Sequence, residues 1–399
     1  MAKPRPLPPI WLMGMGFLPL GASGSVLVIT IPQLLAANHV PEPQIASITA
    51  MALLPGFISF LITPLVDWRF SRRAYAIVFA ALAGLSTFAG LVFIRDLPLL
   101  TGLLFVSGIA IGLCVSAVGG WFGNLTRTED KASLGAWFTV ANFGAGGLVA
   151  TGAIYLLRDL PYVLGAALLS LTIVAALPLY LWVECPPADD RLASESVRDF
   201  ARDVLALLRR PTVLWTLALF LAPSASFALT NVLAGLGRDF HTSEKLVGLI
   251  GGLGVTVAGI VGSLMVPVLS KRVAPRTLYL LVGGVGAAFT LSLIPLGRAP
   301  ATFGLAMLGE NLFQAGAFSA ANVITLRTVG HDNPLAATQF GLLTAATQLP
   351  LTYMQAIDGQ AYGNGGANGS FLADAVISGG ACLILALILW VWRRRIPAV

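Results

Sequence analysis

The sequence PLVDWRFSRR, residues 64–73, separates two long apolar runs. It holds one acid, Asp67, followed by three arginines, Arg69, Arg72 and Arg73. A counterpart lies 203 residues further along the chain, where the following residues coincide: Gly56 with Gly259, Pro64 with Pro267, Arg69 with Arg272, and Arg73 with Arg276. The chain therefore reads as two related halves, each with a short basic turn between its second and third apolar segments.

The composition indicates a membrane protein. Hydrophobic residues make up 57% of the 399 residues and charged residues only 11%, and the mean hydropathy is +0.85. A soluble globular protein carries about 25% charged residues, so this chain cannot cover a water-facing surface. The net charge of +6 is explained by basic loops on one side of a membrane, and we expect no nucleic-acid partner.

Apolar stretches of about 20 residues are long enough to span the hydrocarbon layer as helices. Twelve can be marked, at 10–36, 44–66, 74–94, 99–120, 132–157, 161–183, 213–236, 246–269, 277–297, 300–326, 335–357 and 370–392. They predict an all-α membrane protein with twelve transmembrane helices in two six-helix pseudo-repeats. We place one six-helix bundle at 1–183, a linker at 184–212 and a second six-helix bundle at 213–399.

The basic residues predict the orientation. If the N-terminus lies inside, 19 of the 24 Lys and Arg residues fall in inner segments and five in outer ones. Both termini and the 184–212 linker are then cytoplasmic, in the inner membrane. Apolar residues recur at helical spacing over 197–208, which predicts an amphipathic helix along the inner surface, with a plain linker as the alternative.

Glu310 is the acid that the sequence places in the middle of a span. It lies ten residues after Pro300, at a depth of about 15 Å, near the bilayer midplane. A carboxylate there costs several kcal/mol unless it is protonated, hydrated or paired, and such acids mark transport pathways. Asn311 and Gln314 lie beside it. The alternative is a protonated glutamate that only holds two helices together.

The first and seventh spans carry weak helix formers at matching depths. The first reads PLGASGS over 19–25 and includes Ser23, and the seventh reads PSAS over 223–226 and includes Ser226. Interrupted apolar segments at corresponding positions of two halves indicate a transporter's binding site. Asn231 lies further out on the seventh span. The alternative is that these small residues only allow close helix packing.

The fifth and eleventh spans also carry paired polar residues, at an offset of 202 that joins Asn142 to Thr344. Polar side chains in mid-span are costly against lipid and should face the interior. We therefore assign contacts with substrate or proton to one set of residues: Glu310, Asn311, Gln314, Ser23, Ser226, Asn231, Asn142, Thr344 and Gln348.

The turn at 64–73 lies at the inner surface and is assigned a gating role. An acid at one helix end and arginines at the start of the next can pair across the halves and must separate when that face opens. The set comprises Asp67, Arg69, Arg72, Arg73 and Arg276. A solvated basic turn would explain the arginines but not Asp67.

Other chemistries find little support in the sequence. The three cysteines and three histidines show no paired or ligand-like spacing, so we expect no disulfide, metal or other cofactor. No phosphate-cradling loop is present, so ATP is not expected to drive the protein. A membrane-embedded transferase would need clustered acids, histidines or a nucleophile, and only scattered single residues exist. We predict that the protein is not an enzyme, and the twofold repeat also weighs against a channel or receptor.

Six plus six spans, related halves and an acidic-basic turn after the second span resemble the major facilitator superfamily. The glycine that this family carries within the turn is absent, as is the acid that would stand at Ser270. The resemblance implies two six-helix bundles working by alternating access around a cavity lined by spans one, four, seven and ten. Glu310, Ser23 and Ser226 would then lie together.

Three stretches resemble one branch of that superfamily more closely, namely GFLPL at 16–20, LVD at 65–67 and AATQFGLL at 336–343. The branch holds muropeptide permeases, acetyl-CoA transporters and siderophore importers. It implies proton-coupled uptake of a small polar solute, a muropeptide or a siderophore, by a monomer in the lipid bilayer. The alternatives are an efflux transporter of the same superfamily and a membrane-embedded transferase.

Overall fold

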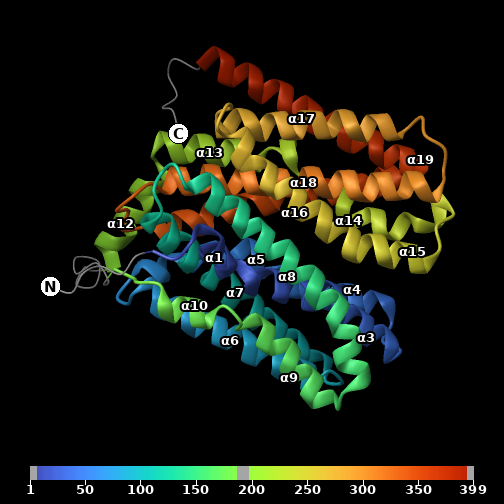
Figure 1. Cartoon of the computed structure of the whole chain (residues 1–399), viewed down its shortest axis with the longest axis horizontal. Coiled ribbons are helices and arrows are strands. Elements are labelled where there is room, and N and C mark those ends of the chain that lie inside the picture. The colour runs from blue at the N-terminus through green and yellow to red at the C-terminus, as the bar shows by residue number, and fades with distance from the viewer. Residues whose placement is uncertain (1–6, 187–196, 393–399) are drawn as a thin grey trace. The chain divides into compact units, whose positions relative to one another are not determined.

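The structure of the chain is a computed structural model that describes residues 7–186 and 197–392. The described residues form helices and connecting turns, with no strand among them (Figure 1). The predicted fold class, an all-α membrane protein with the twelve-span architecture, is confirmed.

The helices of the first half follow the six predicted spans. They are α1 (Ile10–Gly14), α2 (Leu18–Ser25), α3 (Ile31–Ala37), α4 (Glu42–Leu53), α5 (Pro55–Ile58), α6 (Arg72–Val92), α7 (Leu97–Leu125), α8 (Lys131–Asp159), α9 (Tyr162–Ile173) and α10 (Leu177–Trp182). Two of these helices begin with side-chain caps, because Ser71 accepts from the amide of Ala74 and Asp96 from that of Leu99.

The helices of the second half are less regular. They are α12 (Val197–Leu208), α13 (Pro211–Leu221), α14 (Leu229–Leu233), α15 (Glu244–Leu249), α16 (Val255–Leu269), α17 (Pro275–Leu293), α18 (Pro300–Val329) and α19 (Ala336–Trp392). The helix α12 covers the part of the linker in which an amphipathic helix is predicted, with Leu207 buried and Leu205 exposed. Residues 187–196 of the predicted linker lie outside the described residues.

Within the described residues, nine helices are long and apolar enough to cross a membrane, or ten if α12 and α13 are taken as one bent pair. The number falls below twelve for identifiable reasons. The seventh span is broken into short pieces, and α18 is long but carries Glu310, Asn311 and Gln314. The helix α19 counts once although it covers two predicted spans.

A single left-handed residue divides α19 into two arms. Gly366 has φ 58° and ψ −155°, a conformation that residues other than glycine rarely adopt. We call residues 336–365 the first arm and 367–392 the second arm. The hydroxyl of Ser370 in the second arm donates to the carbonyl of Asp358 in the first at 2.8 Å, so the arms pack together.

The first and seventh spans differ in how they depart from a regular helix. The first span stays helical from α1 to α3, with a 3₁₀ turn at Met15–Phe17 and a π turn at Val26–Thr30. The seventh is interrupted, because Ala222 is extended and Phe227 is left-handed at φ 50°. The predicted interruption is therefore complete in the seventh span only.

The chain divides into two compact units. The first comprises residues 1–130, 141–207 and 329–345, and the second comprises 131–140, 208–328 and 346–399. Each unit corresponds largely to one half of the sequence. The exceptions are residues 131–140, which belong to the second unit, and residues 329–345, which belong to the first. The division into bundles at 1–183 and 213–399 stays a prediction.

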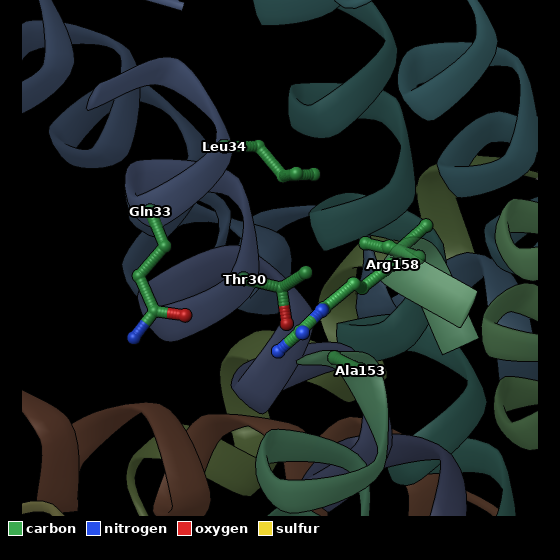
Figure 2. Close-up of a pocket in the computed structure, with 6 residues that line it drawn as sticks. Thr30, Gln33, Leu34, Ala153 and Arg158 are labelled. Atoms are coloured by element: carbon green, nitrogen blue, oxygen red, sulfur yellow. The ribbon is translucent and has the colours of Figure 1, made fainter. Parts of the chain in front are cut away.

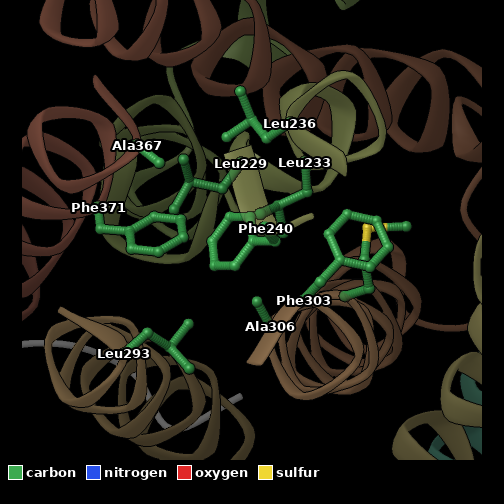
Figure 3. Packing of buried hydrophobic residues seen from close by; sticks show 10 residues of the cluster. Leu229, Leu233, Leu236, Phe240, Leu293, Phe303, Ala306, Ala367 and Phe371 are labelled. Atoms are coloured by element: carbon green, nitrogen blue, oxygen red, sulfur yellow. The ribbon is translucent and has the colours of Figure 1, made fainter. Parts of the chain in front are cut away.

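Each unit has a close-packed interior. In the first unit α6 packs along α7, and the Thr87 and Ser107 hydroxyls meet at 2.8 Å. In the second unit a buried apolar cluster joins α14, α17, α18 and the second arm of α19 (Figure 3). We call this cluster the apolar layer, and it consists of Leu229, Leu233, Leu236, Phe240, Leu293, Phe303, Ala306, Met307, Ala367 and Phe371.

Candidate substrate and coupling site

Glu310 is fully buried in the second unit, with a relative exposure of 0%. Its Oε1 accepts a hydrogen bond of 2.5 Å from the hydroxyl of Thr290 on α17. The same hydroxyl lies 3.0 Å from the carbonyl of Gly286. Among the described residues, Oε2 of Glu310 has no hydrogen-bond partner. The side chain therefore points into the bundle, toward α17.

Two further acids lie in this interior, and the sequence-based view of Glu310 as the single mid-span acid is wrong. Asp358 in the first arm and Asp374 in the second arm of α19 are 0% and 2% exposed. Both belong to the second unit, as Glu310 does. The predicted span boundaries at 357 and 370 had set them at helix ends, whereas the helix continues to the break at Gly366.

Gln314 and Asn311 form their hydrogen bonds with other residues than Glu310 does. The Gln314 amide donates to the Thr230 hydroxyl at 2.7 Å and to the Phe227 carbonyl at 3.3 Å, both at the break in the seventh span. Asn311 donates to the carbonyl of Met307 in its own helix at 2.8 Å. Gln314 therefore holds the broken span, and Asn311 is satisfied locally.

The seventh span contributes buried hydroxyls and one exposed amide, which pairs with an amide of α19. Ser224 and Ser226 are buried, and their hydroxyls have no hydrogen-bond partner among the described residues. Asn231 donates to Oε1 of Gln355 in the first arm of α19 at 3.5 Å, and both side chains are exposed. Two amides in contact are costly against lipid, so we expect this pair to face water.

In the first unit, the first span carries buried hydroxyls of the same kind. Ser23, Ser25 and Thr30 are buried, and within the described chain their hydroxyls have no partner. The neighbouring Gly21 approaches the fifth span so closely that a Cβ would lie 2.0 Å from the carbonyl of Asn142. Ser23 lies in the first unit, whereas Glu310 and Ser226 lie in the second.

A pocket of about 220 Å³ opens beside the π turn of the first unit (Figure 2). It is lined by Thr30, Gln33, Leu34, Ala153, Leu157 and Arg158. The polar ends of Thr30 and Arg158 point toward the same part of the pocket. Sequence reasoning missed Gln33 and Arg158 because both lie near predicted span ends, where polar residues are common.

The eleventh span contributes Thr344 and Gln348, which are both half-buried in the first arm of α19. Thr344 belongs to the first unit, together with Asn142, and Gln348 belongs to the second.

Asp67 is the centre of a second polar cluster, in the first unit. Its Oδ1 accepts from Arg72 Nε at 2.7 Å and from the amide of Ala337 at 3.2 Å. Its Oδ2 accepts from the amide and the hydroxyl of Thr338 at 2.7 and 2.8 Å. The carboxylate therefore caps the N-terminus of α19, where the helix dipole favours a negative charge.

The loop before α19 completes this cluster. Arg72 also donates to the carbonyls of Asn333 and Pro334 at 3.1 and 2.8 Å. Asn124 on α7 donates to the Asn333 carbonyl at 3.1 Å. Sequence reasoning did not assign Asn333 or Thr338 a role, because their contacts with Arg72, Asn124 and Asp67 join residues more than 200 positions apart.

The other predicted gating arginines lie elsewhere. Arg69 is left-handed, and its guanidinium stacks 4.5 Å from the ring centre of Trp68. Arg276, in the second unit, donates to the Thr216 hydroxyl at 3.5 Å. Of the arginines in the predicted gating set, Arg72 makes the ion pair with Asp67 in the described chain.

Lys131 forms a further contact between residues far apart in sequence. It is buried, and its ammonium donates to the carbonyl of Leu326 in the last turn of α18 at 2.9 Å. Asn322, one turn earlier, donates to the hydroxyl of Thr139 at 3.2 Å. The start of the fifth span is thus tied to the end of the tenth within the second unit.

Helices that span a membrane, an interrupted span and buried polar groups within each unit define a multi-pass membrane transporter. The sequence matches the family model of the Major Facilitator Superfamily over residues 13–354. The chain belongs to this family, and it is a secondary transporter.

Solved structures of transporters share the fold. The human organic anion transporter MFSD10 aligns with a TM-score of 0.68 and 16% identity over 94% of this chain and 98% of its own. The E. coli fucose:proton symporter FucP aligns with a TM-score of 0.71 and 14% identity over 95% and 98%.

Two more structures are similar to the same extent. The proton:xylose symporter XylE aligns with a TM-score of 0.72 and 14% identity over 97% of this chain and 94% of its own. A bacterial homologue of the iron transporter ferroportin aligns with a TM-score of 0.67 and 16% identity over 98% and 100%. No curated protein matches the sequence. At these identities the structures establish the fold and leave the substrate open.

Proposed function

We propose that the protein is a proton-coupled importer of a small polar solute in the cytoplasmic membrane, with a muropeptide or a siderophore as the substrate. The observation that carries the proposal is the buried Glu310, which is bound to a hydroxyl and has no basic partner among the residues that the structure describes. An ionised carboxylate in such a place is costly, so the resting form is protonated. Release of the proton then accompanies the movement of solute.

The hydrogen bonds at Thr290 support a protonated Glu310. One hydroxyl proton cannot fully satisfy both the Gly286 carbonyl and the Glu310 carboxylate, which lie at 3.0 and 2.5 Å. A carboxyl proton supplies the second donor, since Glu310 can then donate to Thr290 while Thr290 donates to Gly286. The Gly286 carbonyl and the Thr290 hydroxyl oxygen then each accept one hydrogen bond.

The solute is expected to contact the buried hydroxyls of the interrupted spans. Ser23 and Ser226 have no hydrogen-bond partner in the described chain and lie on the first and seventh spans. Buried hydroxyls without partners cost free energy unless water or a ligand supplies one. The pocket at Thr30 and Arg158 adds a cation, which suits the carboxylates that muropeptides and many siderophores carry.

Asp67 and Arg72 are proposed to hold the cytoplasmic side closed during part of the cycle. The carboxylate binds the first turn of α19, and separation of the two would break three hydrogen bonds at once. We further propose that both termini are cytoplasmic, that the chain acts as a monomer, and that the proton enters with the solute.

The test uses purified protein in liposomes, with uptake of labelled muropeptides and siderophores measured under an imposed pH gradient. Glu310→Gln imitates the protonated form, so pH-driven accumulation should fall at least tenfold while energy-independent exchange continues. Asp239→Asn serves as the control, because this half-buried acid of the same unit bonds to Tyr362 outside the site. Accumulation by Glu310→Gln with the pH dependence of the unmodified protein would contradict the proposal.

A further inference from the structure

We propose that Glu310, Asp374 and Asp358 form one proton-sharing site, which is closed toward the Gly366 end of α19 and entered from the side of the Asn231–Gln355 pair. The inference deepens the proposed proton coupling, on which it rests, by adding two residues and an entrance. It depends on three observations, namely the level of the acids, their unpartnered oxygens and the apolar layer beside them.

The three acids lie at one level of the bundle. Asp358 and Asp374 are each eight residues from Gly366, and Glu310 is ten residues from Pro300. At the helical rise these separations correspond to depths of about 12 and 15 Å from the corresponding helix ends. The close packing of the two arms brings Asp358 and Asp374 together. Met307, three residues before Glu310, and Phe371, three before Asp374, belong to one buried cluster, which places the third acid beside them.

Their oxygens are buried and without partners. In the described chain, both carboxyl oxygens of Asp358, Oδ1 of Asp374 and Oε2 of Glu310 have no hydrogen-bond partner. The hydroxyl of Ser378, one turn beyond Asp374, is buried and unpartnered as well. Polar atoms in such surroundings need water or a proton shared between them.

No basic side chain of the described residues forms an ion pair with any of the three acids. Arg298, in the loop between α17 and α18, is engaged near the Gly366 end of α19. There it bonds to Asn368, and its guanidinium lies 4.7 Å from the ring centre of Phe240. Three carboxylates cannot be ionised together in these surroundings, so protons must neutralise most of them.

Protons suit the site better than a metal ion does. Within the described chain, no group of three or more acids, histidines or cysteines converges closely enough to hold a metal. Carboxyls that are near but not convergent can still exchange a proton through one intervening water. When the proton on Glu310 moves to Asp374, the negative charge moves to Glu310 and the total charge of the site is unchanged.

The apolar layer closes one end of the site. Met307 is three residues before Glu310, Leu293 is three after Thr290, and Phe371 is three before Asp374. Each of these apolar residues is buried, with an exposure of 3% or less, and all belong to the layer seen in Figure 3. Water therefore cannot reach the acids from the end where Pro300 and Gly366 lie without disrupting this layer.

The Asn231–Gln355 pair marks the remaining way in. Gln355 is exposed and lies one helical turn from the buried Asp358 in the same arm of α19. A proton that arrives at this pair meets Asp358 first, and from there it can pass to Asp374 and to Glu310.

Infrared spectroscopy of the purified protein in lipid nanodiscs tests the shared titration without any transport. The carbonyl band of protonated carboxyls is followed against pH in the unmodified protein and in Glu310→Gln, Asp358→Asn and Asp374→Asn. Each substitution should remove one band and shift the titration of the remaining two by about 1 pH unit or more, because coupled groups titrate together. Asp239→Asn should leave all three unchanged.

Unchanged titration of Glu310 in both Asp358→Asn and Asp374→Asn would overturn the inference. Should an Asn variant fail to fold, Asp358→Ser and Asp374→Ser remove the same carboxyl with a smaller polar side chain. The test also separates this inference from the proposed function. Coupled titration without pH-driven uptake would contradict the transport proposal alone, and the reverse result would contradict the shared site alone.

The entrance is tested by kinetics. The rate at which the carboxyl bands shift after transfer into heavy water reports the access of solvent. Gln355→Leu should slow this exchange about tenfold while the equilibrium titration stays the same. Gln360→Leu, an exposed glutamine further along the same arm, is the matched control. Equal exchange rates in the two variants would show that protons enter by another route.

Discussion

Asp67 and Asp358 are both buried aspartates, and their surroundings are opposite. Asp67 accepts four hydrogen bonds, from Arg72, from the amides of Ala337 and Thr338, and from the Thr338 hydroxyl. Asp358 has no partner for either carboxyl oxygen among the described residues. The first surroundings stabilise a charge, and the second penalise one.

The difference assigns the two acids to different tasks. A carboxylate held by an arginine and a helix N-terminus joins elements together, and its contacts must break for those elements to separate. A carboxyl without such partners can gain or lose a proton at modest cost when water reaches it. We therefore expect the first unit to hold a latch at Asp67 and the second unit to hold the titrating groups.

The comparison is tested most strongly by Asp67→Ala. Removal of one partner of a buried ion pair, here with Arg72, leaves the other charge uncompensated. It should lower the free energy of unfolding by about 3 kcal/mol. Denaturant unfolding in detergent should show this loss, and the transport turnover should change more than the apparent affinity. Arg69→Ala, which removes an arginine stacked on Trp68, should cost less than about 1 kcal/mol. Equal losses in the two variants would contradict the latch.

Thr338→Val is expected to have the next largest effect. The substitution keeps the shape of the side chain but removes the hydroxyl that donates to Asp67. A hydrogen bond to a charged group contributes about 2 kcal/mol to the free energy of unfolding, so the variant should lose about this much. Thr338→Ser keeps the hydroxyl and should restore most of the stability. If the serine variant is as unstable as the valine variant, then packing of the threonine methyl, and not the hydrogen bond, is responsible.

Asp358→Asn should have the smallest effect on the free energy of unfolding, below about 1 kcal/mol. A neutral amide replaces a neutral carboxyl of nearly the same shape, so no charge is exposed or left unpaired. The measurement is the same denaturant titration, with Asp67→Asn beside it. A loss of about 3 kcal/mol for Asp358→Asn would mean that Asp358 is ionised and paired, and the contrast with Asp67 would disappear.

The successes of sequence reasoning concern features encoded over short distances. The apolar runs predicted the spans because a helix needs a fixed length of apolar chain to cross a bilayer. The small residues at 222–226 predicted the interrupted seventh span, because they form helices poorly. Asp67 was identified because an acid stands out in a basic turn.

The failures concern residues whose role depends on distant neighbours. Asp358 is followed by Gly359 and Gln360, so the sequence there resembles a loop, although the helix continues to Gly366. The same error hid Asp374. Arg69 and Arg276 resemble Arg72 in sequence, but only the position of the loop before α19 gives Arg72 its acceptors at Asn333 and Pro334.

By itself, the sequence determined the membrane class, the two related halves, the spans and the acid at mid-depth, because hydropathy and repetition are properties of the chain that need no partner. The tertiary structure decided which polar groups are satisfied. Thr338 reaches Asp67 from 271 residues away, and the break at Gly366 folds Asp358 and Asp374 into the same interior as Glu310. The physical reason is that a buried charge is stable only with compensation, and the compensating groups come from whichever helices the fold packs beside it.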